Sequence, residues 1–142
     1  MYKHILLAVD LNADDSWKKA LPTAVEYCKA FDSTLHLLTV VPDFGMTAVA
    51  QFFPDDYDKE ATAQASQALH AFSAAHIPSQ VRVQHIVSYG GIYEEILAAA
   101  TDTKADLIVL EAHRPELADY LLGPNAARVV RHAACSVLVV RN

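Results

Sequence analysis

The chain has 142 residues, 53% of them hydrophobic, and a formal net charge of −6. This length suits a single domain over residues 1–142 with one core. An acidic balance without a basic stripe excludes a protein that tracks nucleic-acid phosphates, and the lack of an apolar run of about 18 residues excludes a membrane span. Residues 1–4 lead directly into a strand-like run rather than a signal peptide, so we expect a cytoplasmic protein.

Five segments have the composition of strands. Residues 5–9, 107–110 and 136–140 are continuous apolar runs, which are typical of strands buried on both faces of a parallel sheet. Residues 34–41 form another strand, which ends at Pro42, and a long loop is expected over 42–58. Residues 81–87 alternate apolar and polar side chains, which predicts a half-buried strand at a sheet edge.

The segments between these strands carry apolar residues at helical spacing. Pro22 in the first of them indicates a kink or a late helix start. Residues 88–91 are expected to form a turn, and residues 125–132 the last helix. The apolar faces are, in chain order, Leu21, Ala24, Val25 and Cys28; Ala65, Ala68, Leu69 and Phe72; Ile92, Ile96, Leu97 and Ala100; and Ala126, Val129, Val130 and Ala133.

Alternating strands and helices predict right-handed βαβ units and a five-stranded parallel α/β sheet with helices on both faces. The apolar first and fourth strands belong in the middle and the alternating third strand at an edge, which gives the order 3-2-1-4-5. The winding direction reverses between the first and fourth strands, and ligands bind in the crevice at such a switch point. Asp10 ends one of these strands, and Glu111, Ala112 and His113 end the other.

Other kinds of site find little support. Cys28 and Cys135 lie in apolar patterns and are expected to be reduced core thiols. The seven histidines show no zinc-ligand spacing, and the chain has neither a P-loop nor a nucleophile elbow. We therefore expect no metal and no catalytic residue.

Three segments resemble the universal stress protein family. They are I-L-L-A-V-D at 5–10, L-H-L-L-T-V-V at 35–41, and the stretch from D-L-I-V-L at 106–110 to R-H-A-A-C-S-V-L-V-V-R at 131–141. The wording H-R-P-E-L-A-D-Y-L-L-G-P-N-A-A at 113–127 is similar to the bacterial F and G subgroup. The resemblance implies a Rossmann-like fold of the adenine-nucleotide alpha-hydrolase-like type.

Many members of that family bind ATP in the crevice, on a pattern of three glycines followed by Ser or Thr. Here Glu111 and Arg114 stand at the first two glycine positions and Pro124 replaces the Ser or Thr. A carboxylate repels phosphates, and proline lacks a backbone N–H donor. The nucleotide contacts that the resemblance implies are Ala8, Val9, Asp10, Val40, Leu110, Glu111, His113, Arg114, Gly123, Pro124 and Asn125.

Several of these residues have a structural alternative. Asp10 could accept ribose hydroxyls or form a strand-end turn or helix cap, and Val40 could present its backbone to adenine or belong to the core. Arg114 could pair with phosphate or form a surface salt bridge. Gly123 suits a tight turn, and Asn125 could cap the last helix or also contact phosphate. His113 is expected to be structural or to lie beside the ribose rather than to act as a catalyst.

Three functions remain open. The first is a regulatory protein of the stress response that binds ATP or AMP, with or without Mg²⁺, and is not an enzyme. The second is a nucleotide-free dimeric module that regulates a partner such as a transporter or an enzyme. The third is slow ATP hydrolysis or self-phosphorylation.

The last strand, residues 136–140, is apolar on both faces yet lies at a sheet edge, which predicts a homodimer through Ser136–Val140.

Overall fold

The computed structural model describes residues 1–42, 57–112 and 124–141. Its centre is a five-stranded sheet in the order β3-β2-β1-β4-β5, with every neighbouring pair parallel. This confirms the predicted topology. The strands are β1 (His4–Ala8), β2 (Thr34–Pro42), β3 (Arg82–Gly90), β4 (Leu107–Ala112) and β5 (Ser136–Arg141).

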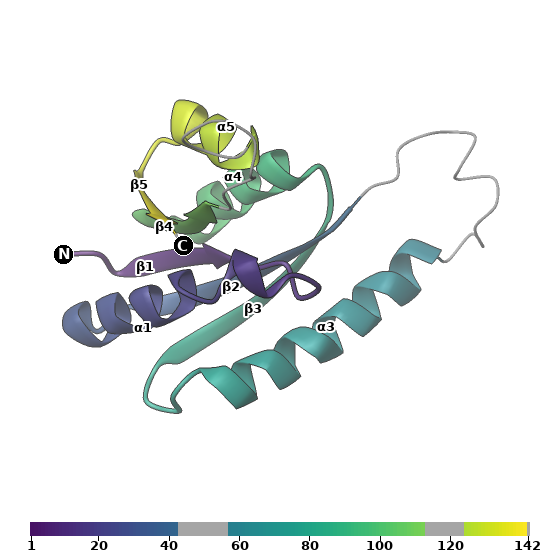
Figure 1. Ribbon diagram of the computed structural model, residues 1–142, viewed down its shortest axis with the longest axis horizontal. Coiled ribbons are helices and arrows are strands. Elements are labelled where there is room, and N and C mark those ends of the chain that lie inside the picture. Colours follow the sequence, from purple (N-terminus) through teal and green to yellow (C-terminus); the bar gives the residue numbers. More distant parts are fainter. Residues whose placement is uncertain (43–56, 113–123, 142) are drawn as a thin grey trace.

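Helices cover both faces of the sheet, as predicted. One face packs against α1 and α3 and the other against α4 and α5 (Figure 1). Among the described residues, no helix is long and apolar enough to cross a membrane. The helical elements are the short 3-10 helix η1 (Asp14–Ser16) followed by α1 (Ala20–Phe31), α3 (Tyr57–His76), α4 (Ile92–Thr103) and α5 (Pro124–His132).

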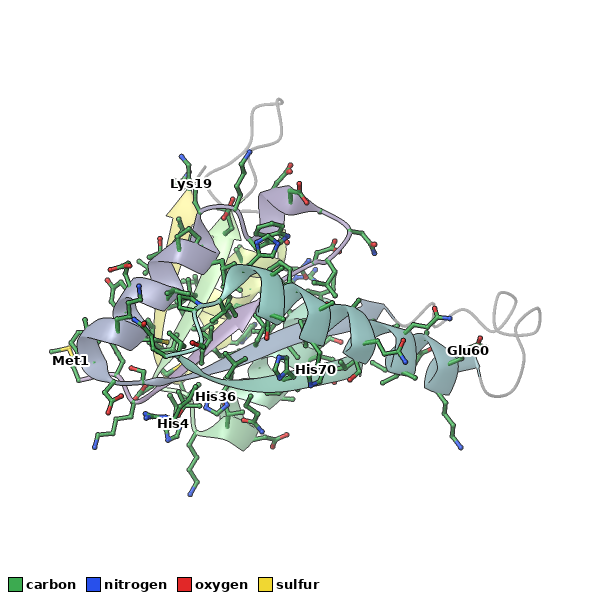
Figure 2. The ribbon with its side chains drawn as sticks, turned by 90° about the horizontal axis from the view of Figure 1, so that it is seen from below. Met1, His4, Lys19, His36, Glu60 and His70 are labelled. Carbon is green, nitrogen blue, oxygen red and sulfur yellow. The ribbon has the colours of Figure 1, made fainter. Side chains whose placement is uncertain are left out.

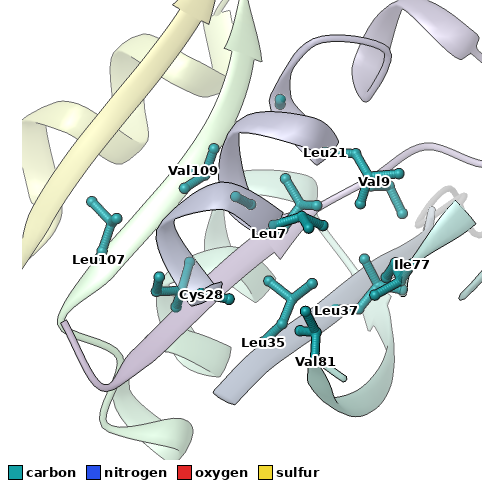
Figure 3. Packing of buried hydrophobic residues seen from close by; sticks show 14 of the residues in the cluster. Leu7, Val9, Leu21, Cys28, Leu35, Leu37, Ile77, Val81, Leu107 and Val109 are labelled. Atoms are coloured by element: carbon teal, nitrogen blue, oxygen red, sulfur yellow. The ribbon is translucent and has the colours of Figure 1, made fainter. Parts of the chain in front are cut away.

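The central strand β1 divides the core into two clusters. Ile5 and Leu7 point toward α1, whereas Leu6 points toward α4 and α5, and all three are fully buried. Figure 3 shows Leu7 and Val109 of the sheet packed near Leu21 of α1. Burial of each such side chain stabilises the folded state by about 1.5–3 kcal/mol. The buried residues of β1 and β4 therefore stabilise the strands at whose ends the site candidates lie.

The expected turn at residues 88–91 is wrong. β3 continues through Gly90 and pairs with β2 as far as Pro42, and Gly91 is the N-cap of α4. Gly90 has φ of +150°, a conformation that side-chain-bearing residues rarely adopt. The strand therefore ends in a backbone geometry that suits glycine, one residue before the helix begins.

The expected loop at 42–58 is too long at both ends. Pro42 belongs to β2 and residues 57 and 58 to α3, while 43–56 lie outside the described residues. The late helix start indicated by Pro22 is confirmed, because α1 begins at Ala20 and places this proline in its first turn. There a missing N–H breaks no intrahelical bond.

The last helix also differs from expectation. α5 begins at Pro124, so Asn125 is its second residue and not its N-cap. Proline suits the first helical position because its φ is already helical. Val130 was expected in the core but is 44% exposed, whereas Ala126 and Val129 are buried.

Both cysteines are free thiols, as expected. Cys28 is buried and Cys135 half-buried. Burial raises the pKa of the Cys28 thiol to about 11, although Arg82 nearby opposes the shift. Burial also raises the pKa of Cys135. Both are therefore protonated at neutral pH and are poor nucleophiles.

Candidate functional site

The ligand position expected from the sequence lies at the carboxyl ends of β1 and β4, where β1 has β2 on one side and β4 on the other. Asp10 follows the carboxyl end of β1, and Glu111 lies near the end of β4. The first turn of α1, which starts at Ala20, comes to the same place. This is the switch point of a doubly wound sheet, where ligands bind in such folds.

Glu111 links the end of β4 to the start of α1. Its Oε1 accepts the backbone N–H groups of Lys19 and Ala20, each at 2.7 Å. These two groups are among the donors at a helix start that lack an intrahelical partner, and the negative charge lies at the positive end of the helix dipole. The Glu111 carboxylate thus takes the place at the start of α1 where a bound anion would otherwise lie. The sequence did not indicate this role.

Asp10 forms the strand-end turn that was one of its two predicted roles. Its Oδ1 accepts the Asn12 N–H at 2.9 Å, and its own N–H donates to Ser16 Oγ at 2.8 Å. Ser16 Oγ in turn lies 3.0 Å from the Asp10 carbonyl oxygen. The residue is exposed, so the turn holds a carboxylate at the crevice in contact with solvent.

The apolar site candidates divide between the two faces of the sheet. Ala8, Val40 and Leu110 belong to the cluster beneath α4 and α5, whereas Val9 belongs to the α1 cluster. The Val9 backbone is also occupied: its N–H donates to the Leu38 carbonyl at 2.9 Å, and its carbonyl accepts the Thr39 hydroxyl at 2.9 Å. Ala8, Val40 and Leu110 thus share one face of the sheet.

The remaining candidates lie at or beyond the limits of the described residues. His113, Arg114 and Gly123 fall outside them, so their expected roles stay predictions. Pro124 begins α5, and Asn125 is half-buried in its first turn. Within 1–42, 57–112 and 124–141, no group of three or more His, Cys, Asp or Glu residues is placed to hold a metal ion.

Trp17, in the connection between β1 and α1, packs against α3. Its ring meets that of Phe72 edge to face at a centroid distance of 4.9 Å, and the His76 ring lies at 4.9 Å as well. The indole Nε1 is buried and has no hydrogen-bond partner among the residues that the structure describes. The segment that carries Asp10 is therefore held against α3 by aromatic packing.

A polar cluster on the α4 face was not predicted. His4 Nδ1 lies 3.0 Å from His36 Nε2, and His36 Nδ1 contacts Gln84 Oε1; Figure 2 shows the two imidazoles side by side. Because Gln84 Oε1 can only accept, His36 Nδ1 carries the proton and Nε2 accepts from His4. The strand register could have revealed this cluster, since Gln84 pairs with His36.

This cluster predicts a pH-dependent stability. Burial lowers the pKa of His36, and His4 lowers it further, although the bond to Gln84 opposes the shift. In the unfolded chain the pKa of His36 is about 6.5. Neutral His36 therefore stabilises the folded state fully above that pH, and this stabilisation is lost as the pH falls toward the lower pKa of the folded state. Denaturant unfolding at pH 7.5 and 5.5 should show lower stability at the acidic value.

His36→Phe should flatten this dependence relative to the wild type. His85, whose pKa burial and His70 also lower, remains in both proteins and cancels in the comparison. Glu95 and Asp102 face the same hollow as His36 and are likewise unchanged. An identical pH slope for the two proteins would show that His36 does not titrate between the states.

The strand order and the helices on both faces define a doubly wound α/β protein, a class in which ligands bind at the switch point. A family model for the universal stress protein family matches residues 1–141, and the chain belongs to that family. Universal stress protein G of Escherichia coli O157:H7 is 30% identical, covering 99% of this chain and 100% of the relative.

Solved structures agree with this assignment. The universal stress protein UspA from Lactobacillus plantarum superposes with a TM-score of 0.74 at 28% identity, covering 99% of this chain and 98% of that chain. A universal stress protein solved in complex with cAMP shares the fold at a TM-score of 0.62 and 22% identity, covering 99% and 97% of the two chains.

Proposed function

We propose that this universal stress protein binds an adenine nucleotide in the crevice between β1 and β4, and acts in the cytoplasm as a regulator rather than as an enzyme. The observation that carries the proposal is the exposed Asp10 carboxylate at the switch point, next to the strands whose residues Ala8, Val40 and Leu110 share one face of the sheet. A protein of the same fold solved with cAMP supports an adenine ligand.

The residues suggest an orientation for the ligand. The exposed Asp10 carboxylate suits ribose hydroxyls, and the shared face of Ala8, Val40 and Leu110 suits the base. The phosphates would meet Arg114 and the residues around the start of α5. Glu111 already supplies negative charge at the start of α1, and this charge repels ATP more than the less highly charged AMP. We therefore expect AMP to compete with ATP better here than in relatives that have a small residue at this position.

Arg114→Ala should weaken nucleotide binding by about tenfold or more, because a charge-assisted contact to phosphate contributes about 1.5–3 kcal/mol. Calorimetry with ATP, AMP and a non-adenine nucleotide measures the effect. Arg131→Ala removes the same charge at the far end of α5 and is the matched control. Equal affinities for the two variants would remove Arg114 from the site.

A nucleotide-free dimeric module is the second candidate, and the Glu111 anchor favours it because the α1 start already holds an anion. The double variant Glu111→Ala/Pro124→Ser removes that anion and restores a hydroxyl and an N–H donor. If neither wild type nor double variant releases heat with millimolar nucleotide, the protein is such a module for a transporter or enzyme. Phosphate release in the same samples tests slow ATP hydrolysis.

A further inference from the structure

A hollow lies on the α4 side of the sheet, with a volume of about 430 Å³. β2 and β3 form one wall and α4 the other. It exists because β3 is an edge strand that is covered by α3 on one face, while α4 packs mainly against β2 on the other. None of its described lining residues belongs to the predicted nucleotide site. Figure 2 shows His36, which lines it, on the opposite side of the molecule from Lys19 at the crevice.

The charge of this hollow is negative at both ends. Glu95 and Asp102 line it from α4 and lie seven residues apart, which places them on one side of the helix about 10 Å apart along its axis. In the described part of the chain neither carboxylate forms a salt bridge, and no Lys or Arg lines the hollow. The Glu95 carboxylate lies against the backbone at Gly90, at the β3–α4 junction.

The lining between the carboxylates is apolar or uncharged. Ala98, Ala99 and Ile86 present hydrocarbon, and Ser88 presents a hydroxyl group. His36 is 6% exposed, and burial lowers its pKa, so it adds no positive charge at neutral pH. The hollow is thus a groove in which hydrocarbon lies between two carboxylates that are spaced about 10 Å apart along α4.

We propose that this groove binds a linear aliphatic polyamine, a hydrocarbon chain with at least two ammonium groups. The terminal ammonium groups pair with Glu95 and Asp102, and the methylene chain lies over Ala98, Ala99 and Ile86. A monoamine would satisfy one carboxylate and a neutral diol neither. Two charges at a fixed spacing are therefore the feature that the groove selects.

Titration of the nitrogen-15-labelled protein with spermidine and putrescine, without nucleotide and at low salt, tests the proposal. Butylamine and butanediol serve as ligand controls. Glu95→Gln and Asp102→Asn each remove one carboxylate of the groove. Glu94→Gln removes the neighbouring carboxylate, which is exposed and does not line the groove, and so matches the change in net charge.

We expect saturable amide shifts at Ser88, Ala98 and Ala99, and three- to tenfold weaker binding in each groove variant, since partly exposed ion pairs contribute modestly. Glu94→Gln should bind like the wild type. The proposal is wrong if Glu94→Gln weakens binding as much as Glu95→Gln and Asp102→Asn do, if butanediol binds as tightly as putrescine, or if the shifts lie outside the groove. Two groove variants keep the test decisive should one of them fail to fold.

Discussion

Replacing Glu111 by alanine should lower the free energy of unfolding by about 2 kcal/mol, because two backbone donors at the start of α1 lose a charged acceptor. Glu111→Gln should lose roughly half as much, since its amide oxygen still accepts but carries no charge. Chemical denaturation monitored by circular dichroism measures both. Glu26→Ala, which removes only an exposed pair with Lys29, should leave stability nearly unchanged.

The same substitution should act on the ligand in the opposite direction. Glu111→Ala leaves the N–H groups of Lys19 and Ala20 available to a phosphate and deletes a repelling charge. We therefore expect a less stable protein that binds ATP more tightly. If Glu111→Ala unfolds at the wild-type denaturant concentration, the anchor does not contribute to stability.

Val139→Lys should convert the homodimer predicted from the sequence into a monomer. β5 lies at the end of the sheet order, and its four central residues, all apolar, are half-buried in the single chain. A second copy paired along Ser136–Val140 would cover them symmetrically, whereas a lysine there places a charge in the interface and blocks edge-to-edge pairing. Light scattering at micromolar concentration distinguishes the two masses.

Val130→Lys is the matched control, because it makes the same change at a valine that is 44% exposed on α5 and is not part of β5. It should leave the mass unchanged. A wild type that scatters as a monomer, or a Val139→Lys variant that remains a dimer, would place any interface elsewhere.

The strand order could be predicted because burial leaves a pattern in the sequence. Ile5, Leu6 and Leu7 had to lie between two layers, and the alternation from residue 81 to 87 required an edge. The turn expected at 88–91 failed because Gly90 resembles a turn residue, whereas pairing with β2 continues to this point. Local composition cannot report how far a neighbouring strand extends.

The site was less accessible to prediction. Asp10 was found because it ends an apolar run, and its turn depends on residues within six positions of it. The role of Glu111 depends on Lys19 and Ala20, more than ninety positions away. Such a contact arises only when the chain brings the end of β4 to the start of α1, so no pattern around residue 111 carries it.

The packing of Trp17 gives the protein an intrinsic optical reporter. It is the only tryptophan in the chain, so selectively excited indole emission comes from a single place. That place is the connection that carries Asp10, against Phe72 and His76 of α3. The emission therefore reports the packing of the β1–α1 connection near Asp10 in the unmodified protein, without an added label.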